Sequence, residues 1–339
     1  MKEVKCAIIG FGGIARAHAA GYRILAEEGA PVRLVAVCDI DPQKFGGELK
    51  INVDTGKGTL PADCATYTSV EELLASADFD MADICLPTYL HKEYAIKMLK
   101  AGKHVLSEKP MALNYADCLE MVETAKAEGR RLMIGQCLRF NAAYSFLKAC
   151  CEDGRYGKLR HLSMARLSAL PTWGFENWFQ ITEKSGGCIT DMHIHDVDMA
   201  RYLLGEPKAV STTAWNGTVK WQTQNTRLFY DDCTVVIDGS WDEVKGTPFH
   251  SSFRARFERG EVISSKGGAL TVYPEGGEAF EPELPALNHM AEEIRYLAGL
   301  ITDPEKENLK NPPESAAATV RLIEYLRESA DNNAKLITL

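Results

Sequence analysis

The stretch that decides the fold is Val4-Lys5-Cys6-Ala7-Ile8-Ile9, followed at once by Gly10-Phe11-Gly12-Gly13-Ile14-Ala15. The first six residues form an apolar run typical of a buried β-strand, and the next six fit the pattern Gly-x-Gly-x-x-Ala at the start of a helix. Gly10 permits a tight turn, Gly12 lets backbone N–H groups approach a pyrophosphate, and Ala15 lets the helix pack closely on the strand. The helix N-terminus itself favours an anion. The stretch therefore predicts a dinucleotide-binding turn that contains all six residues from Gly10 to Ala15.

The residues that follow alternate short apolar runs with helical patterns. Strands are expected at 4–9, 34–38, 81–86, 104–106 and 132–134, and helices at about 13–28, 69–76, 90–101 and 114–128. Continuous apolar strands separated by helices imply a parallel sheet covered on both faces. Residues 1–135 are therefore expected to form a doubly wound, dinucleotide-binding domain. The polar segment 50–68, which is rich in Gly and Asp, is expected to be an extended loop.

The second predicted strand ends in Val37-Cys38-Asp39. An acid at this strand end is where a ribose diol is held. The carboxylate would repel a 2′-phosphate and no Arg follows at once, so NAD is favoured over NADP. The alternative role for Asp39 is to cap the turn ahead of Pro42.

The pattern of predicted strands and helices changes after about Arg139. A helix is expected near 142–152, a strand at 159–167, an aromatic and Gly-rich loop at 171–187, and a helix at 193–204 that Gly205 and Pro207 end. Alternating segments follow at 209–215, 226–230, 234–241, 251–258, 261–264 and 269–272, and helices at about 286–301 and 313–330. Strand patterns without intervening helices predict an α/β domain over 136–339 with a large, mostly antiparallel open sheet. The terminal helices are free to pack back on the first domain.

Composition excludes several classes of protein. With 339 residues the chain has the length of about two domains of ~150 residues. A net charge of −9 argues against a nucleic-acid partner, and no apolar run approaches the ~20 residues of a membrane span. The ten cysteines form no Cys-x-x-Cys pair, and no secretory signal is expected ahead of the first strand. Reduced thiols and a cytoplasmic location are therefore expected.

A candidate catalytic lysine follows the strand at 104–106, in the sequence Ser107-Glu108-Lys109-Pro110. Ligands of open α/β sheets bind beyond the carboxyl ends of the strands, which is where Lys109 is expected. Its ammonium group can donate a hydrogen bond to a substrate hydroxyl and stabilise a developing alkoxide. The alternative is a solvated turn.

A second cluster, Asp191-Met192-His193-Ile194-His195-Asp196-Val197-Asp198, lies at the start of a predicted helix. On one continuous helix, positions 191, 195 and 198 share a face and positions 193 and 196 share another. His195 titrates near neutral pH and suits general base chemistry. Alternatively, the acids only satisfy free N–H groups. His193 and His195 lack a third metal ligand at recognisable spacing, so no metal is expected.

These motifs, in this order, resemble the Gfo/Idh/MocA oxidoreductases. The resemblance rests on Gly10–Ala15, on Ile84–Thr88 with His91, on Glu108-Lys109-Pro110, and on Gly186-Gly187 leading into Asp191 and His195. It covers nearly the whole chain. It implies an N-terminal Rossmann domain, a nicotinamide cofactor, and a C-terminal α/β domain whose open sheet often forms an oligomer interface. A homodimer or homotetramer is therefore expected.

The resemblance also implies roles for single residues. Lys109 would polarise the reacting hydroxyl or carbonyl, and His195 would act as acid and base. Asp191 would orient the substrate or His195, and Glu108 would support Lys109 beside the cofactor. His193 stands where the family commonly has Gly, so it either projects into the site or simply packs.

Other residues match the family by position. Pro87, Thr88 and His91 match the loop that lines the cofactor. Trp178 belongs to a loop, 177–179, that often reaches the nicotinamide or substrate, and its alternative role is that of an aromatic anchor. Arg139 is expected either to contact substrate or to form a structural salt bridge.

The expected function is that of an NAD(P)-dependent dehydrogenase acting on the CH–OH group of a sugar, sugar derivative or polyol. Two alternatives remain within the family: a glycosidase or lyase that recycles its NAD, and a non-catalytic cofactor-binding regulator. The expected partner is a small carbohydrate or polyol, with no nucleic acid and no membrane.

Overall fold

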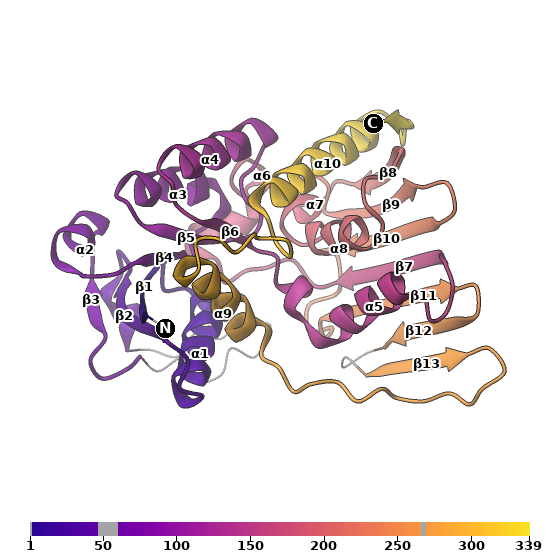
Figure 1. Cartoon of the computed structure of the whole chain (residues 1–339). Helices are drawn as coiled ribbons and strands as arrows, with labels where there is room; N and C mark the ends of the chain where they lie inside the picture. Colours follow the sequence, from indigo (N-terminus) through magenta and orange to yellow (C-terminus); the bar gives the residue numbers. More distant parts are fainter. Residues whose placement is uncertain (1, 47–59, 266–268) are drawn as a thin grey trace. The chain divides into compact units, whose positions relative to one another are not determined.

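The computed structural model describes residues 2–46, 60–265 and 269–339, and the chain divides into two compact units (Figure 1). The first unit contains Met1–Phe140 and Leu287–Ala317, and the second contains Asn141–Ala286 and Ala318–Leu339. The chain thus returns to the first unit after completing most of the second. Residues 50–59 of the polar segment 50–68 lie outside the described residues.

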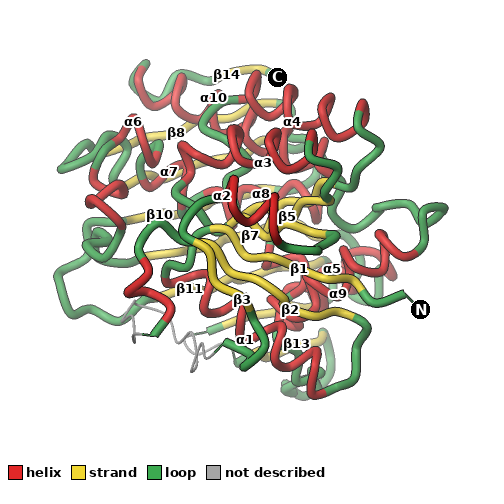
Figure 2. Tube along the Cα trace, turned by 90° about the vertical axis from the view of Figure 1, so that its left-hand side faces the viewer, coloured by secondary structure: helices red, strands yellow, loops and turns green. Residues whose placement is uncertain are grey.

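The sheet of the first unit is parallel, with six strands in the order β3-β2-β1-β4-β5-β6. The strands are β1 (Val4–Ile9), β2 (Val32–Cys38), β3 (Ala65–Tyr67), β4 (Met81–Ile84), β5 (His104–Glu108) and β6 (Leu132–Gly135). The predicted parallel sheet is confirmed. The expectation of a loop over 50–68 is wrong for β3, which pairs with Ala36–Cys38 at the sheet edge and can be followed beside β2 in Figure 2. Three residues are too few for a period to show in the sequence.

Helices cover both faces of this sheet (Figure 1). They are α1 (Gly13–Glu27), α2 (Val70–Ser76), α3 (His91–Lys100), α4 (Tyr115–Ala127) and α9 (His289–Thr302). Helix α9 packs against α1, β1 and β5, while α3 packs against α4, β4 and β5. The buried residues Met290, Ile294 and Leu297 recur at spacings of three and four, so α9 has one apolar face. That face joins the core formed by β1, β2 and α1.

The second unit is built on an eight-stranded mixed sheet in the order β13-β12-β11-β7-β10-β9-β8-β14. The strands are β7 (Leu159–Leu167), β8 (Ala209–Trp215), β9 (Thr223–Phe229), β10 (Thr234–Ser240), β11 (His250–Phe257), β12 (Gly260–Ser264), β13 (Leu270–Pro274) and β14 (Ile337–Thr338). Strands β7 and β10 run parallel and the other neighbours are antiparallel. The predicted large, mostly antiparallel sheet is confirmed.

Helices lie over one face of this second sheet, as Figure 1 shows for α5, α7 and α8. The helices are α5 (Ala142–Asp153), α6 (Thr182–Ser185), α7 (Cys188–Asp191), α8 (Ile194–Leu204) and α10 (Pro313–Asp331). Short 3₁₀ turns are η1 (Pro42–Phe45), η2 (Thr88–Leu90), η3 (Cys137–Phe140) and η4 (Phe175–Gln180).

In β9 buried and exposed residues alternate, which is typical of a sheet with one covered face. Phe229 of β9 and Trp215 of β8 are among the exposed side chains.

Across the described ranges, no helix combines the length and the apolar character needed to cross a membrane. All ten cysteines are free thiols, and seven of them are buried. The buried thiols behave as small core residues.

Candidate active site

The turn after β1 has the geometry needed to receive a pyrophosphate. Gly10 has a φ of +87°, and a Cβ at this position would lie 2.8 Å from Leu86 Cδ2 and 2.9 Å from the Cys85 carbonyl oxygen. Gly12 caps α1 without any side-chain cap, and no described atom lies within 4 Å of the place a Cβ would take there. The N-terminus of this 15-residue helix, whose first N–H groups lack intrahelical carbonyl partners, is thus open beside Gly12. This arrangement fits a dinucleotide.

Asp39 lies where the predicted ribose-binding acid should lie, directly after β2. Its Oδ2 accepts the Phe11 N–H at 2.7 Å, and its Oδ1 accepts the Asp41 N–H at 2.9 Å. The ammonium of Lys44 lies 3.0 Å from both oxygens. Capping of the following turn falls to Asp41, which accepts the Gln43 N–H. Lys44 was not among the predicted site residues. The only signal for it in the sequence is its position five residues after the acid.

The loop after β4 is tied to the loop after β5 by His91. Its Nδ1 lies 2.7 Å from the Pro110 carbonyl oxygen and its Nε2 lies 2.8 Å from the Leu86 carbonyl oxygen. Burial lowers the pKa of His91, which is 1% exposed. Thr88, also buried, begins the short η2 turn that follows β4, and Pro87 directly precedes that turn. His91 thus braces the loops at this edge of the sheet, and both of its ring nitrogens lie against backbone carbonyls.

Lys109 follows β5 at the same carboxyl edge of the sheet as Gly10 and Asp39. It is half-buried, and its backbone N–H donates to Glu108 Oε2 at 3.1 Å. Glu108 is buried, and its Oε1 lies 2.9 Å from His18 Nε2. Burial raises the pKa of Glu108, but the hydrogen bond and charge of His18, helped by Lys109, lower it overall. The carboxylate is therefore ionised beside the candidate catalytic lysine.

In the second unit, the run from Asp191 to Ala200 exposes two side chains in part. Every residue of this fully described run is buried except Asp191 and His195. The expected single helix over the cluster is wrong, because α7 ends at Asp191 and α8 begins at Ile194. The chain turns between them, with the His195 N–H donating to the Met192 carbonyl at 3.3 Å. Partial exposure, rather than a common helix face, distinguishes the two candidate catalytic residues.

The buried acids of the cluster have structural partners. Arg166 holds Asp196 with two hydrogen bonds, Nε to Oδ2 at 2.9 Å and Nη2 to Oδ1 at 3.0 Å. Asp198 accepts a hydrogen bond from Thr319 Oγ1 at 2.8 Å. His193 is fully buried, and its Nε2 lies 2.9 Å from Thr226 Oγ1 on β9. Of the two roles left open for His193, the structure supports packing in the interior rather than projection into the site.

Two further candidates, Arg139 and Trp178, are also buried. Arg139 is 2% exposed and donates to the Lys310 carbonyl at 3.1 Å and to Ser315 Oγ at 2.8 Å, all within the first unit. Trp178 stacks on Phe179 with ring centroids 3.9 Å apart, and Phe179 meets the ring of Trp241 edge-on. The stacking of Trp178 is that of an aromatic anchor, whereas the Arg139 partners named here are a carbonyl and a hydroxyl rather than a carboxylate.

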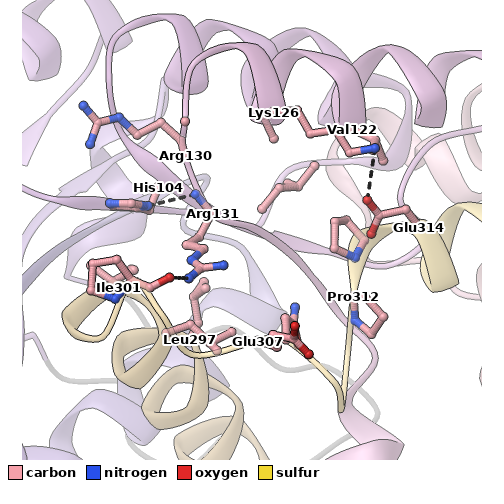
Figure 3. A pocket seen from close by; sticks show the side chains of 17 residues that line it. His104, Val122, Lys126, Arg130, Arg131, Leu297, Ile301, Glu307, Pro312 and Glu314 are labelled. Atoms are coloured by element: carbon pink, nitrogen blue, oxygen red, sulfur yellow. Dashed lines mark hydrogen bonds and ion pairs between the residues drawn. The ribbon is translucent and has the colours of Figure 1, made fainter.

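A cavity of about 730 Å³ lies elsewhere in the first unit (Figure 3). Its lining includes His104 and Leu132, which begin β5 and β6. Arg131 crosses it to donate to the Pro304 carbonyl at 2.6 Å, and Lys126 pairs with Glu314 at 3.4 Å. The cavity therefore belongs to the amino edge of the parallel sheet, opposite the edge that carries Gly10, Asp39 and Lys109. Ligands of such sheets bind at the carboxyl edge, so the cavity is not the candidate active site.

Comparison with known proteins agrees with this geometry. Residues 4–136 match the family model described as GFO_IDH_MocA, oxidoreductase family, NAD-binding Rossmann fold. Residues 144–269 match the model of the GFO/IDH/MocA C-terminal domain. The first match spans all six strands of the parallel sheet, and the second spans β7 to β12 of the eight-stranded sheet.

Individual relatives carry different activities. Inositol 2-dehydrogenase of Rhizobium meliloti is 30% identical over 271 residues, 78% of this chain and 74% of that protein. 2,7-Anhydro-N-acetylneuraminate hydratase of Mediterraneibacter gnavus is 35% identical over 219 residues, 64% of this chain but only 54% of that protein. The crystal structure of aldose-aldose oxidoreductase from Caulobacter crescentus, complexed with glycerol, superposes over 100% of both chains with a TM-score of 0.83. At 23% identity that last likeness concerns the fold.

Proposed function

Because the chain belongs to the Gfo/Idh/MocA family of oxidoreductases, with an NAD(H)-binding Rossmann domain, we propose that it is a dehydrogenase of sugars, sugar derivatives or polyols. The reaction is hydride transfer between a secondary alcohol and a nicotinamide. The observation that carries the proposal is the carboxyl edge of the first sheet, where Gly10, Asp39 and Lys109 each follow a parallel strand. The inositol dehydrogenase relative supports the substrate class.

Each candidate residue has one task in this proposal. The nicotinamide, when bound, accepts or returns the hydride. His195 takes the proton of the hydroxyl that is oxidised, a contribution of about 10²–10⁴-fold for a well-placed general base. Lys109 donates a hydrogen bond to the same oxygen and stabilises its negative charge. Asp191 holds a neighbouring hydroxyl or orients the His195 ring.

The choice of cofactor and the assembly state extend the same proposal. NAD is the expected cofactor because Asp39 ends β2 with a carboxylate, which disfavours a 2′-phosphate. A homodimer or homotetramer would form through the uncovered face of the second sheet, on which Trp215 and Phe229 are exposed. The expected location is the cytoplasm.

A substrate screen combined with two variants tests the proposal. Sugars, inositols, uronic acids and amino-sugar derivatives are offered with NAD, and NADH absorbance is followed. With the active compound, Lys109→Met and His195→Asn should each lower kcat by about 100-fold or more. Lys103→Met is the control, because Lys103 precedes β5 at the opposite edge and donates to the Phe79 carbonyl. Near wild-type turnover in both site variants would overturn the catalytic assignment.

A second candidate function follows from the hydratase relative. An enzyme that oxidises, eliminates or adds water, and then reduces again would recycle its cofactor and use the same lysine and histidine. Supplying glycosides or anhydro-sugars to the protein without external NAD separates the two functions. Product formation with no net NADH supports the recycling reaction, and stoichiometric NADH that depends on added NAD supports the dehydrogenase.

A further inference from the structure

A buried histidine connects α1, β4 and β5 next to the turn that carries Lys109. His18, on α1, has no exposed surface. Its Nδ1 lies 2.9 Å from Asp83 Oδ2 on β4, and its Nε2 lies 2.9 Å from Glu108 Oε1 on β5. One side chain thus holds two buried carboxylates, and one of these belongs to the residue before Lys109.

The surroundings keep this histidine doubly protonated. Asp83 also accepts hydrogen bonds from the Tyr22 hydroxyl at 3.0 Å and from Cys85 Sγ at 3.6 Å. Burial alone lowers the pKa of His18, but the Asp83 carboxylate reverses this effect and raises the pKa well above its ordinary value. Burial raises the pKa of Tyr22 and of Cys85, so both remain protonated donors. The ring therefore donates from both nitrogens at neutral pH.

Two titratable residues of α9, Glu293 and His289, lie near this cluster and add no charge to it. Glu293 is fully buried, and its two carboxyl oxygens find no hydrogen-bond partner among the described residues. Burial raises the pKa of Glu293 well above its ordinary value, so it is a neutral acid. Burial likewise lowers the pKa of His289, which is neutral. The remaining charges balance as two cations, His18 and Lys109, against two anions, Asp83 and Glu108.

We infer that His18 is a positioning residue, which holds Glu108 so that Glu108 can hold the backbone of Lys109 in place. The path is short: His18 Nε2 to Glu108 Oε1, then Glu108 Oε2 to the Lys109 N–H at 3.1 Å. His91 contacts the next residue, with its Nδ1 2.7 Å from the Pro110 carbonyl oxygen. The inference rests on the role proposed above for Lys109.

Glu108 could not perform this task without the histidine. A buried carboxylate that loses its cation either takes up a proton or moves toward water, and both changes weaken its hold on the Lys109 N–H. His18, Asp83 and Cys85 also bring possible metal-ligand atoms within 4.8 Å of one another. A metal ion there would have to break the hydrogen bond between His18 and Asp83, so the hydrogen-bonded charge array is the better account.

A double-mutant cycle tests the inference. His18→Gln keeps one amide donor but removes the charge, and it should lower kcat by about 10–100-fold with the Kd of NADH changed by less than about twofold. His18→Gln combined with Lys109→Met should be no slower than Lys109→Met alone, because both changes act through one ammonium group. His104→Gln is the matched control, since His104 begins the strand that Glu108 ends. Its kcat should stay at the wild-type value.

Hydrogen–deuterium exchange gives a readout that does not depend on turnover. The peptide that spans Lys109 should exchange faster in His18→Gln than in the wild type, and Glu108→Gln should reproduce the change if His18→Gln fails to fold. Additive losses in the cycle, or unchanged exchange in this peptide, would overturn the inference. Wild-type turnover in Lys109→Met would instead refute the role proposed for Lys109, and the exchange data would still show whether His18 holds the turn.

Discussion

The ammonium of Lys44 lies 3.0 Å from both carboxylate oxygens of Asp39, at the carboxyl end of β2. Two backbone N–H groups, from Phe11 and Asp41, bind the same carboxylate. A ribose diol that binds Asp39 must therefore share the carboxylate with Lys44. The same ammonium also offsets the negative charge that would repel a 2′-phosphate.

The first prediction concerns coenzyme choice. Lys44→Met should increase the preference for NAD over NADP by roughly tenfold, or about 1.4 kcal/mol, because it leaves the Asp39 charge uncompensated. Fluorescence titration of both coenzymes gives the two Kd values. Lys97→Met, which removes an exposed lysine paired with Glu71, should leave the ratio unchanged. An unaltered ratio in Lys44→Met would show that Lys44 does not influence the choice.

The second prediction concerns stability in acid. Burial lowers the pKa of His193 to about 3, so the ring is neutral when folded but takes up a proton when unfolded below about pH 6.5. The unfolded chain then binds more protons, and stability falls as the pH drops. Between pH 7 and pH 5 this one group should lower the free energy of unfolding by about 2 kcal/mol.

Urea unfolding at the two pH values checks this contribution. His193→Gln retains a polar atom near Thr226 but does not titrate, so its pH-dependent loss should be smaller than that of the wild type by about 2 kcal/mol. His161→Gln, which alters a histidine on β7 of the same sheet, is the control. Equal losses in wild type and His193→Gln would contradict the buried, neutral state of the ring.

The third prediction concerns the buried ion pair of Arg166 and Asp196, whose side chains are 8% and 0% exposed. Burial raises the pKa of Asp196 despite the Arg166 charge, so an isolated Asp196 can become neutral by taking up a proton. An isolated guanidinium cannot become neutral in this way, because arginine stays charged. Asp196→Asn should therefore lower the free energy of unfolding by about 3–5 kcal/mol, and Arg166→Met by less. Urea denaturation of both variants measures the difference, and the reverse order would refute the argument.

The fourth prediction separates the two roles considered for Trp178. The side chain is 9% exposed and stacks on Phe179, so Trp178→Ala should lower the free energy of unfolding by about 3–5 kcal/mol. Trp178→Phe preserves much of the stacking and should retain most of the stability. A residue that mainly contacts substrate would behave differently, with KM raised and the melting temperature unchanged. Thermal melts and KM values for both variants decide between the roles.

Much of the fold could be predicted because its signals are local. The strands of the first sheet other than β3 are mostly apolar runs, and the turn at Gly10–Ala15 is complete within six residues. The short edge strands β3 and β14 escaped prediction, since two or three residues carry no period and pair only because a neighbouring strand is present. The break between α7 and α8 was also missed, because the residues of the turn, Met192 and His193, are both acceptable in a helix.

The candidate site was predictable in its chemistry but not in its support. Lys109, Asp191 and His195 stand in recognisable motifs, whereas Arg166 reaches Asp196 across 30 positions of sequence. His18 meets Asp83 and Glu108 across 65 and 90 positions. In the sequence, a histidine on a helix and an aspartate in an apolar strand give no sign that they are partners. Only the folded sheet brings them together.

The sequence by itself determined the order of the strands and helices, the dinucleotide turn and the reactive residue types, because these depend on side-chain period and on glycine at fixed spacing. Only the tertiary structure decided which polar residues are exposed and which are held in the interior. His193, Arg139 and Trp178 are buried, while Asp191 and His195 keep part of their surface. The reason is physical: burial and hydrogen-bond partners come from elements that are distant in the chain, and a polar group's chemistry depends on whether those partners have already satisfied it.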